Sequence, residues 1–327
     1  MTLTRCARRT LLHTTLAAAI ATLAGPALAD GFPDKAITFV VPFTAGSATD
    51  QLARALANAI TADTKTPVVV DNRPGANAFI GAQVVAKAKP DGYTVLIATN
   101  TTHAANEHLY KKLPYDPVKD FEPITALGRG GQLMVVRPDY PARSVGEFIK
   151  LAKAQPGKLS FGAGSSSSRI AGEMFKQLTG TYILAIPYRS NPPAVTDLLG
   201  GQIDVMFTDM ATGLPQVKAG KLRALGVTPR QRSALAPEVP TIEEAGVKGY
   251  EATYWFAAYA PAGTPAPVVA KLNELLHKAA HSSAQAAFYQ PTGTETYLNT
   301  PEEQRKFQAV ESQKWGRIIK AAGIEPE

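Results

Sequence analysis

The loop from Phe43 to Ala48 carries the clearest chemical signal in the sequence. It follows a short apolar run and leads into a helical segment that begins near Thr49. Its residues are small, so its backbone can approach a ligand closely. The first N–H groups of a helix have no partner inside the helix, and the helix dipole favours a negative charge there. We therefore expect the backbone N–H groups of Gly46, Ser47 and Ala48 to hold a carboxylate or phosphate.

More polar loops follow later strands, and the ends of such strands form the ligand edge of an open α/β sheet. Alternative roles are open for several residues of these loops and of the first one. Ser47 and Asp50 fit a capping box, and residues 99–103 could be an ordinary hydroxyl-rich loop in which His103 has its hydrogen bonds satisfied. The serine-rich segment before Arg169 could be a surface loop, but a helix follows it, which favours an anion cradle. The candidate ligand-binding residues are Phe43, Thr44, Ala45, Gly46, Ser47, Ala48, Asp50, Thr99, Asn100, Thr101, Thr102, His103, Gly164, Ser165, Ser166, Ser167, Ser168, Arg169, Tyr188, Arg189 and Asp209.

Arg169 stands at the beginning of a helix, where a cation opposes the helix dipole. This position is favourable if an anion lies between the guanidinium of Arg169 and the beginning of the helix, because a guanidinium binds a carboxylate through two hydrogen bonds. Arg169 would then hold a second carboxylate, and a dicarboxylate would bridge two lobes. Aromatic walls would favour an aromatic diacid such as a phthalate isomer. The alternatives are an Arg169 paired with a surface acid and core packing for the aromatics Tyr188, Tyr254, Trp255 and Phe256.

Known catalytic and metal-binding motifs are missing from the sequence. The pair Gly162 and Gly164 lacks the third glycine of a dinucleotide loop, and there is no P-loop, G-x-S-x-G or H-E-x-x-H motif. The histidines do not group as metal ligands, and the single cysteine is Cys6. Lysines and arginines are scattered, which argues against nucleic-acid binding. We expect no enzyme, no cofactor and no metal.

The first 29 residues have the features of an export signal. Three arginines precede an apolar stretch that is too short for a stable membrane span, and Ala27–Ala29 forms a small-x-small cleavage site. Adjacent Arg8 and Arg9 also allow the twin-arginine route instead of Sec. Removing this segment lowers the formal net charge from +7 to +4 and leaves no cysteine. We expect a soluble periplasmic protein.

Strands and helices alternate along the rest of the chain, which favours parallel sheets with right-handed crossovers. Expected strands lie at 39–42, 68–70, 93–98, 134–136, 159–162, 183–187, 203–207, 224–227 and 254–259. Expected helices lie at 78–88, 144–154, 170–178, 194–199, 214–218, 267–280 and 301–322. The mature chain is long enough for two lobes, and no low-complexity linker separates them.

Seven further segments together resemble Bug-type periplasmic solute-binding receptors of tripartite tricarboxylate transporters. The resemblance covers nearly all of the mature chain and rests on residues 32–35 with 40–43, 70–76, 89–93, 108–117, 197–204, 240–246 and 261–265. It departs from the usual family pattern at Ser47, Arg169 and Ser190, and in having Arg189 for a lysine; all of these lie on candidate ligand loops.

The resemblance implies an α/β fold of two lobes, like that of type II periplasmic binding proteins, with the ligand cleft between them. Crossovers near Gly130 and Tyr250 would divide the chain into residues 30–130 with 251–327 and residues 131–250. A ligand carboxylate would lie on the first loop, often with bridging waters. We expect a monomeric carrier that passes an organic carboxylate or dicarboxylate to the membrane components of a transporter. The alternatives are a periplasmic enzyme for such acids and a receptor that reports to a two-component system.

Overall fold

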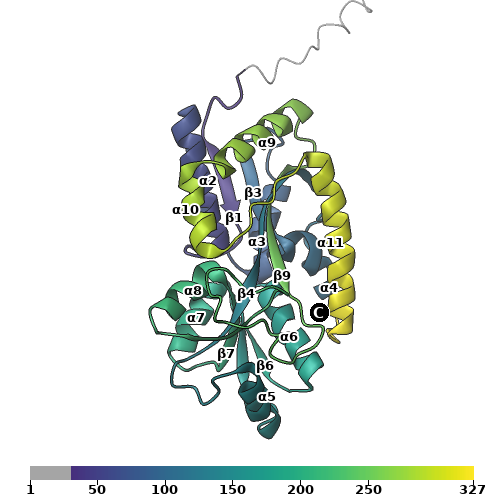
Figure 1. The fold of residues 1–327 in the computed structure, drawn as a ribbon. Coiled ribbons are helices and arrows are strands. Elements are labelled where there is room, and N and C mark those ends of the chain that lie inside the picture. Colours follow the sequence, from purple (N-terminus) through teal and green to yellow (C-terminus); the bar gives the residue numbers. More distant parts are fainter. Residues whose placement is uncertain (1–30) are drawn as a thin grey trace, which may run out of the picture.

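The computed structural model describes residues 31–327, so the expected signal peptide, Cys6 and the cleavage after Ala29 lie outside the described residues. Figure 1 shows two α/β lobes, one above the other, joined by the strands β4 and β9. We call residues 31–130 with 251–327 lobe 1 and residues 131–250 lobe 2, which is the division proposed from the sequence. The described chain contains no helix with the length and apolar character needed to cross a membrane.

The strands form one path in the order β2-β1-β3-β9-β4-β7-β5-β6, with β8 paired to β4. Lobe 1 contributes β1 (Ile37–Val41), β2 (Val68–Asn72), β3 (Thr94–Thr99) and β9 (Thr253–Pro261). Lobe 2 contributes β5 (Ser160–Ala163), β6 (Leu184–Pro187), β7 (Val205–Asp209) and β8 (Arg223–Val227). The strand β4 (Phe121–Val136) runs through both lobes: Gly131 pairs with β9, whereas Gln132 pairs with β7.

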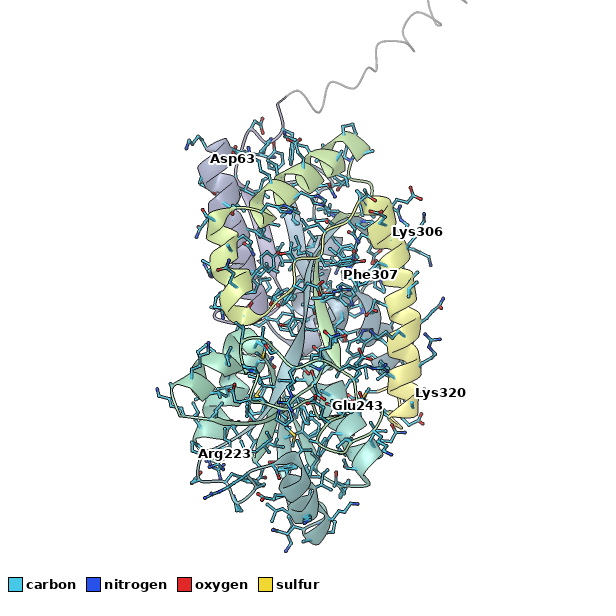
Figure 2. All side chains as sticks on the ribbon, in the orientation of Figure 1. Asp63, Arg223, Glu243, Lys306, Phe307 and Lys320 are labelled. Carbon is cyan, nitrogen blue, oxygen red and sulfur yellow. The ribbon has the colours of Figure 1, made fainter. Side chains whose placement is uncertain are left out.

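Helices cover the faces of both sheets (Figure 1). Lobe 1 has α2 (Ala48–Thr64), α3 (Phe79–Ala86), α4 (Asn106–Leu109), α9 (Ala266–Ala280), α10 (Ser283–Thr292) and α11 (Pro301–Ala321), with a 3-10 turn at Ala76–Ala78 and a π-helical turn at Thr101–Ala105. Lobe 2 has α5 (Val145–Ala154), α6 (Ser166–Thr179), α7 (Asn191–Leu199) and α8 (Met210–Lys218). Figure 2 shows Phe307 pointing from α11 toward the sheet, while Lys306 and Lys320 point to solvent.

The sheets are mixed, which corrects the expectation of parallel sheets alone. The sets β2-β1-β3 and β7-β5-β6 are parallel, but β4 and β9 are antiparallel to each other and to their other partners. The reason is the two-lobed path: β4 carries the chain into lobe 2 and β9 carries it back. The alternation of strands and helices predicts the two parallel sets of strands, but it does not predict that the connecting strands β4 and β9 are antiparallel to their neighbours.

Candidate functional site

A cavity of about 40 Å³ lies between the lobes, where the loops after β1, β3, β5 and β7 meet. Side chains and backbone from both lobes line it, and it is small because the lobes are closed on each other. Its lining consists of Phe43, Ser47, Ala48, Thr49, Thr99, Asn100, Gln132, Gly164, Ser165, Ser167, Ser190, Asn191, Asp209, Tyr254 and Phe256.

The N-terminus of α2 forms the lobe 1 side of the cavity. Ser47 caps this helix by accepting a hydrogen bond from the Asp50 N–H (3.3 Å). Within the described chain, no acceptor pairs with the N–H groups of Ala48 and Thr49, because they precede the first bond of the helix. These two donors, at the positive end of the α2 dipole, are what the loop offers an anion.

The other two donors expected in this loop are already used. The Gly46 N–H donates to Asp50 Oδ2 (2.9 Å), and the Ser47 N–H donates to the Thr44 carbonyl (3.2 Å). Gly46 has a φ of 79°, so its role is to turn the chain into the helix. The donor set therefore lies further along the chain than the sequence predicts, at Ala48 and Thr49.

Asp50 supports this loop from behind and does not line the cavity. Its carboxylate also accepts hydrogen bonds from Arg54 (3.0 Å) and from Asn72 Nδ2 (2.9 Å). Burial would raise the pKa of Asp50, but these hydrogen bonds, that of Gly46 and the charge of Arg54 outweigh burial and lower it. Asp50 is thus a fixed anion that shapes the turn.

Lobe 2 presents the beginnings of two more helices to the cavity. In α6, Ser165 and Ser168 form a capping box, and the Ser166 N–H donates to Thr101 Oγ1 (3.3 Å). The N–H of Ser167 has no partner among the described residues. In α7, prolines follow Asn191 at the next two positions, so Asn191 has the one N–H of that segment, and it is also unpaired in the described chain. Backbone donors thus face the cavity from both lobes.

Several buried side-chain atoms at the cavity have no partner within residues 31–327. They are both amide atoms of Asn100, Gln132 Oε1, Asn191 Oδ1 and Tyr254 Oη. A buried polar group without a partner is costly, so such a cluster indicates a missing polar ligand. Burial, followed by the charge of Asp209, raises the pKa of Tyr254, which keeps its hydroxyl neutral.

The lining contains some of the expected residues and omits others. Those present are Phe43, Ser47, Ala48, Thr99, Asn100, Gly164, Ser165, Ser167 and Asp209. Those not on it are Thr44, Ala45, Gly46, Asp50, Thr101, Thr102, His103, Ser166, Ser168, Arg169, Tyr188 and Arg189. The candidate set omitted Thr49, Gln132, Ser190 and Asn191, and it also lacked Tyr254 and Phe256, which had been considered only as aromatic walls. The sequence feature that could have predicted Ser190 and Asn191 is a polar pair directly before two prolines that open a helix. Gln132 has no such feature near it in the sequence.

Two groups of contacts close the lobes around the cavity. On one side, Thr44 Oγ1 donates to Ser190 Oγ (2.9 Å). On the other, Ser166 Oγ lies 3.0 Å from Asn77 Nδ2 and 3.1 Å from Asn106 Oδ1. Next to it, Ile170 of α6 is 1% exposed and belongs to a core cluster whose other members come from lobe 1. These contacts have to break when the cleft opens.

Arg169 belongs to the contacts that join the two lobes, and it does not line the cavity. Its Nη2 lies 2.7 Å from Glu327 Oε1, while the Glu327 backbone is paired with Leu109 and Lys111 of lobe 1. Among the other candidates that lie off the cavity, the Tyr188 hydroxyl donates to Asp197 (2.7 Å), and Arg189 is exposed. Within the described residues, no arginine, lysine or histidine side chain lines the cavity.

The contacts of α6 with lobe 1 predict how variants of this helix will bind a ligand. Ile170→Ala should weaken the binding of every ligand by the same factor, about thirtyfold or more, because it costs about 2–5 kcal/mol of core packing only in the closed form. Arg169→Ala should have a smaller effect that shrinks with salt, since a half-exposed ion pair contributes little. Calorimetry with matched mono- and dicarboxylates tests this. A preference for diacids that disappears in Arg169→Ala would instead place the guanidinium on the ligand.

His103 is a core residue. Its ring stacks on Tyr259 at 3.8 Å between centroids and contacts Phe121 edge to face. The side chain is fully buried, and Nδ1 lies 2.9 Å from Thr102 Oγ1. Burial lowers the pKa of His103 from 6.5 to about 3. His103 therefore has a structural role and is not at the ligand site, but it differs from the expected loop histidine with satisfied hydrogen bonds: it lies in a buried π-helical turn, and its Nε2 has no partner within the described residues.

This burial predicts an acid-sensitive fold. The unfolded chain binds a proton at His103 below about pH 6.5 and the folded chain does not, so stability falls as the pH drops from 6.5 toward 3. At pH 5 the loss is about 2 kcal/mol. Denaturant unfolding at pH 7.5 and pH 5.0 should show this loss, and His103→Phe should reduce it. An equal pH dependence in both proteins would contradict the assignment.

One serine–histidine–carboxylate group exists away from the cavity. His108 Nε2 lies 3.0 Å from Ser312 Oγ, which donates to Glu107 Oε1 (2.5 Å). In a catalytic triad the carboxylate orients the other nitrogen of the histidine. Here the serine proton goes to the carboxylate instead, so the arrangement joins α4 to α11 and does not activate a nucleophile.

Comparison with known proteins gives consistent matches. A family model described as the tripartite tricarboxylate transporter family receptor matches residues 52–324. Protein BugT of Bordetella pertussis is 34% identical over 310 residues, which cover 94% of this chain and 95% of BugT. A protein encoded in the tcbD-tcbE intergenic region of a Pseudomonas species is 35% identical over 293 residues, 89% of this chain and 87% of that protein.

Solved structures agree with these matches. The structure of Rpa4515 from R. palustris with adipate has a TM-score of 0.87 and 35% identity, and covers 90% of this chain and 100% of that one. The periplasmic binding protein BugD has a TM-score of 0.87, 33% identity and the same coverage. MatC from Rhodopseudomonas palustris with bound malate has a TM-score of 0.83 and 28% identity, covering 88% and 100%.

Proposed function

This chain belongs to the tripartite tricarboxylate transporter family of receptors, of the Bug type, and from that membership we propose that it captures a small organic carboxylate in the periplasm. It then delivers the acid to the membrane components of a transporter. The observation that carries this proposal is the pair of free N–H groups at Ala48 and Thr49, which face a closed cavity between two lobes. Ligand-driven closure of the lobes is the conformational change that such a carrier needs.

We propose a dicarboxylate as the ligand, with one carboxylate at each lobe. The first would bind at the beginning of α2 and the second at the beginning of α6, at the free N–H group of Ser167. Such sites hold anions without a cationic side chain, because several amides and a helix dipole share the charge. Related receptors with adipate and with malate support this class.

The cavity favours a slender aliphatic acid over an aromatic one. Its volume of about 40 Å³ holds about three water molecules, which is less than either kind of diacid needs, so the residues of the lining have to distinguish the two. Of the four aromatic residues proposed as walls, Tyr254 and Phe256 line it, whereas Trp255 donates to Glu311 on α11 and Tyr188 bonds to Asp197. A phthalate ring would require the lobes to open further than an aliphatic chain does.

The experiment is to purify the protein under native conditions, release bound small molecules and identify them by mass spectrometry. Calorimetry with aliphatic dicarboxylates, their monocarboxylate analogues and the phthalate isomers then ranks the classes. The chain contains two tryptophans, Trp255 and Trp315, whose indoles both donate to Glu311, so a change in intrinsic fluorescence during the titration would report a change in this part of lobe 1. Binding of phosphate or sugars, and of no carboxylate, would overturn the proposal.

We also expect binding without conversion. The lining offers serine and threonine hydroxyls and one carboxylate, Asp209, but Asp209 accepts from Asn191 Nδ2 and the Thr212 N–H, and no hydrogen bond within the described residues joins it to a hydroxyl. The lining therefore contains no paired base and nucleophile. After prolonged incubation, chromatography should recover the ligand unchanged. A product that forms with the wild type and is lost in an Asn100→Ala variant would point to an enzyme instead.

A further inference from the structure

Asp209 stands out among the residues that line the cavity, because it has the only carboxyl side chain among them, and none of them is a lysine, arginine or histidine. It is 6% exposed and caps α8, where Oδ1 accepts from the Thr212 N–H (2.8 Å). Its Oδ2 accepts from Asn191 Nδ2 (2.6 Å). No cation within residues 31–327 forms an ion pair with it.

These contacts leave Asp209 able to accept more hydrogen bonds. A carboxylate has about four acceptor positions, and two are used here. The α8 dipole and the two donors compensate part of the charge. Another carboxylate placed beside it would be repelled, whereas a hydroxyl or ammonium group would be attracted.

The neighbouring side chains offer acceptors as well. Asn191 has to turn its Nδ2 toward Asp209, since a carboxylate only accepts, and this leaves Asn191 Oδ1 without a partner in the described chain. Gln132 Oε1 is a third acceptor without a partner there. The lobe 2 wall thus combines the free amides of α6 and α7 with a cluster of acceptors.

We propose that Asp209 selects acids that carry a hydrogen-bond donor on their carbon chain, that is, 2-hydroxy or 2-amino dicarboxylic acids. This inference rests on the proposed function and names the class of ligand more narrowly. The end carboxylates would bind at the helix N-termini, while the substituent donates to Asp209. A plain diacid would leave Asp209 facing the ligand with no donor to bind.

The test uses pairs of acids that differ only in this substituent. Succinate is compared with malate and aspartate, and glutarate with 2-hydroxyglutarate and glutamate, by calorimetry on the full protein. In the wild type, the substituted acid of at least one chain length should bind at least tenfold more tightly than the plain diacid. In Asp209→Asn this preference should fall below about threefold, with plain diacids bound at least as well as before.

Asn is a good N-cap, so Asp209→Asn should fold, and thermal unfolding checks this. Asp197→Asn is the matched control, because it removes an acid of lobe 2 that bonds to Tyr188 away from the cavity. Equal affinity for plain and substituted acids in the wild type, or a preference kept in Asp209→Asn, would overturn the inference. Binding of other carboxylates but of none of these substituted acids would overturn the inference alone, whereas binding of no carboxylate at all would overturn the proposed function and the inference with it.

Discussion

Gly164→Ala should weaken ligand binding at least tenfold while the protein still folds. A Cβ at this position would lie 2.5 Å from the backbone N and Oδ1 of Asn191 and from the carbonyl carbon of Ser190. Two of these atoms belong to backbone that starts α7, so they cannot rotate away. The beginning of α7 would have to move, and with it a wall of the cavity. Such overpacking costs about 1–3 kcal/mol, which corresponds to about fivefold to more than a hundredfold in affinity if the cost arises only in the ligand-bound form. Because backbone has to move here, we expect the upper part of this range.

Gly146→Ala is the control for this substitution. It lies in α5 of the same lobe, and its added Cβ would meet nothing within 4 Å. Its affinity should equal that of the wild type, and its stability should stay the same or rise, because alanine favours a helix. Calorimetry and thermal unfolding measure both. Unchanged affinity in Gly164→Ala would mean that the contact of Gly164, in the loop after β5, with the beginning of α7 does not shape the ligand site.

Ala48→Pro should weaken binding of any carboxylate by about tenfold to a hundredfold, the value of a hydrogen bond to a charged group. Ala48 is the first residue of α2, a position at which proline is favoured and its missing N–H costs the helix nothing. Ser47 has φ −67° and ψ 159°, which suits a residue before proline. The variant therefore removes one backbone donor and leaves the helix in place.

Ala48→Ser separates this loss from an effect of size. It adds bulk at the same position and keeps the N–H, so it should bind much more tightly than Ala48→Pro. Calorimetry on both variants with the same acid gives the comparison. Equal losses would show that the cavity wall, and not the donor, determines affinity.

The local elements of the site were predictable where one short segment determines them. The loop before α2 gave the anion site because a run of small residues before a helix exposes unpaired N–H groups. The sequence of this loop did not show which backbone N–H groups are free, because this depends on the Asp50 side chain, which turns back and accepts a hydrogen bond from the Gly46 N–H. The fold class followed from alternation of elements and from the resemblance, but the antiparallel joining strands depend on the path between the lobes.

Residues that depend on distant partners were beyond such reasoning. Arg169 meets Glu327, which is 158 positions away in the sequence, and the pair forms only because the C-terminal segment packs on lobe 1. Gln132 reaches the cavity because β4 passes from one sheet to the other at Gly131. Nothing near Gln132 in the sequence indicates this position.

The most direct measurement is the amide spectrum of the protein in the absence and presence of its acid ligand. With ¹⁵N-labelled alanine, the Ala48 signal is identified by its loss in Ala48→Pro and followed during the titration. An N–H that binds a carboxylate should shift downfield, and the Ala48 signal should move to saturation with the affinity that calorimetry gives. A saturating ligand that leaves the Ala48 amide unmoved would contradict carboxylate capture at the beginning of α2.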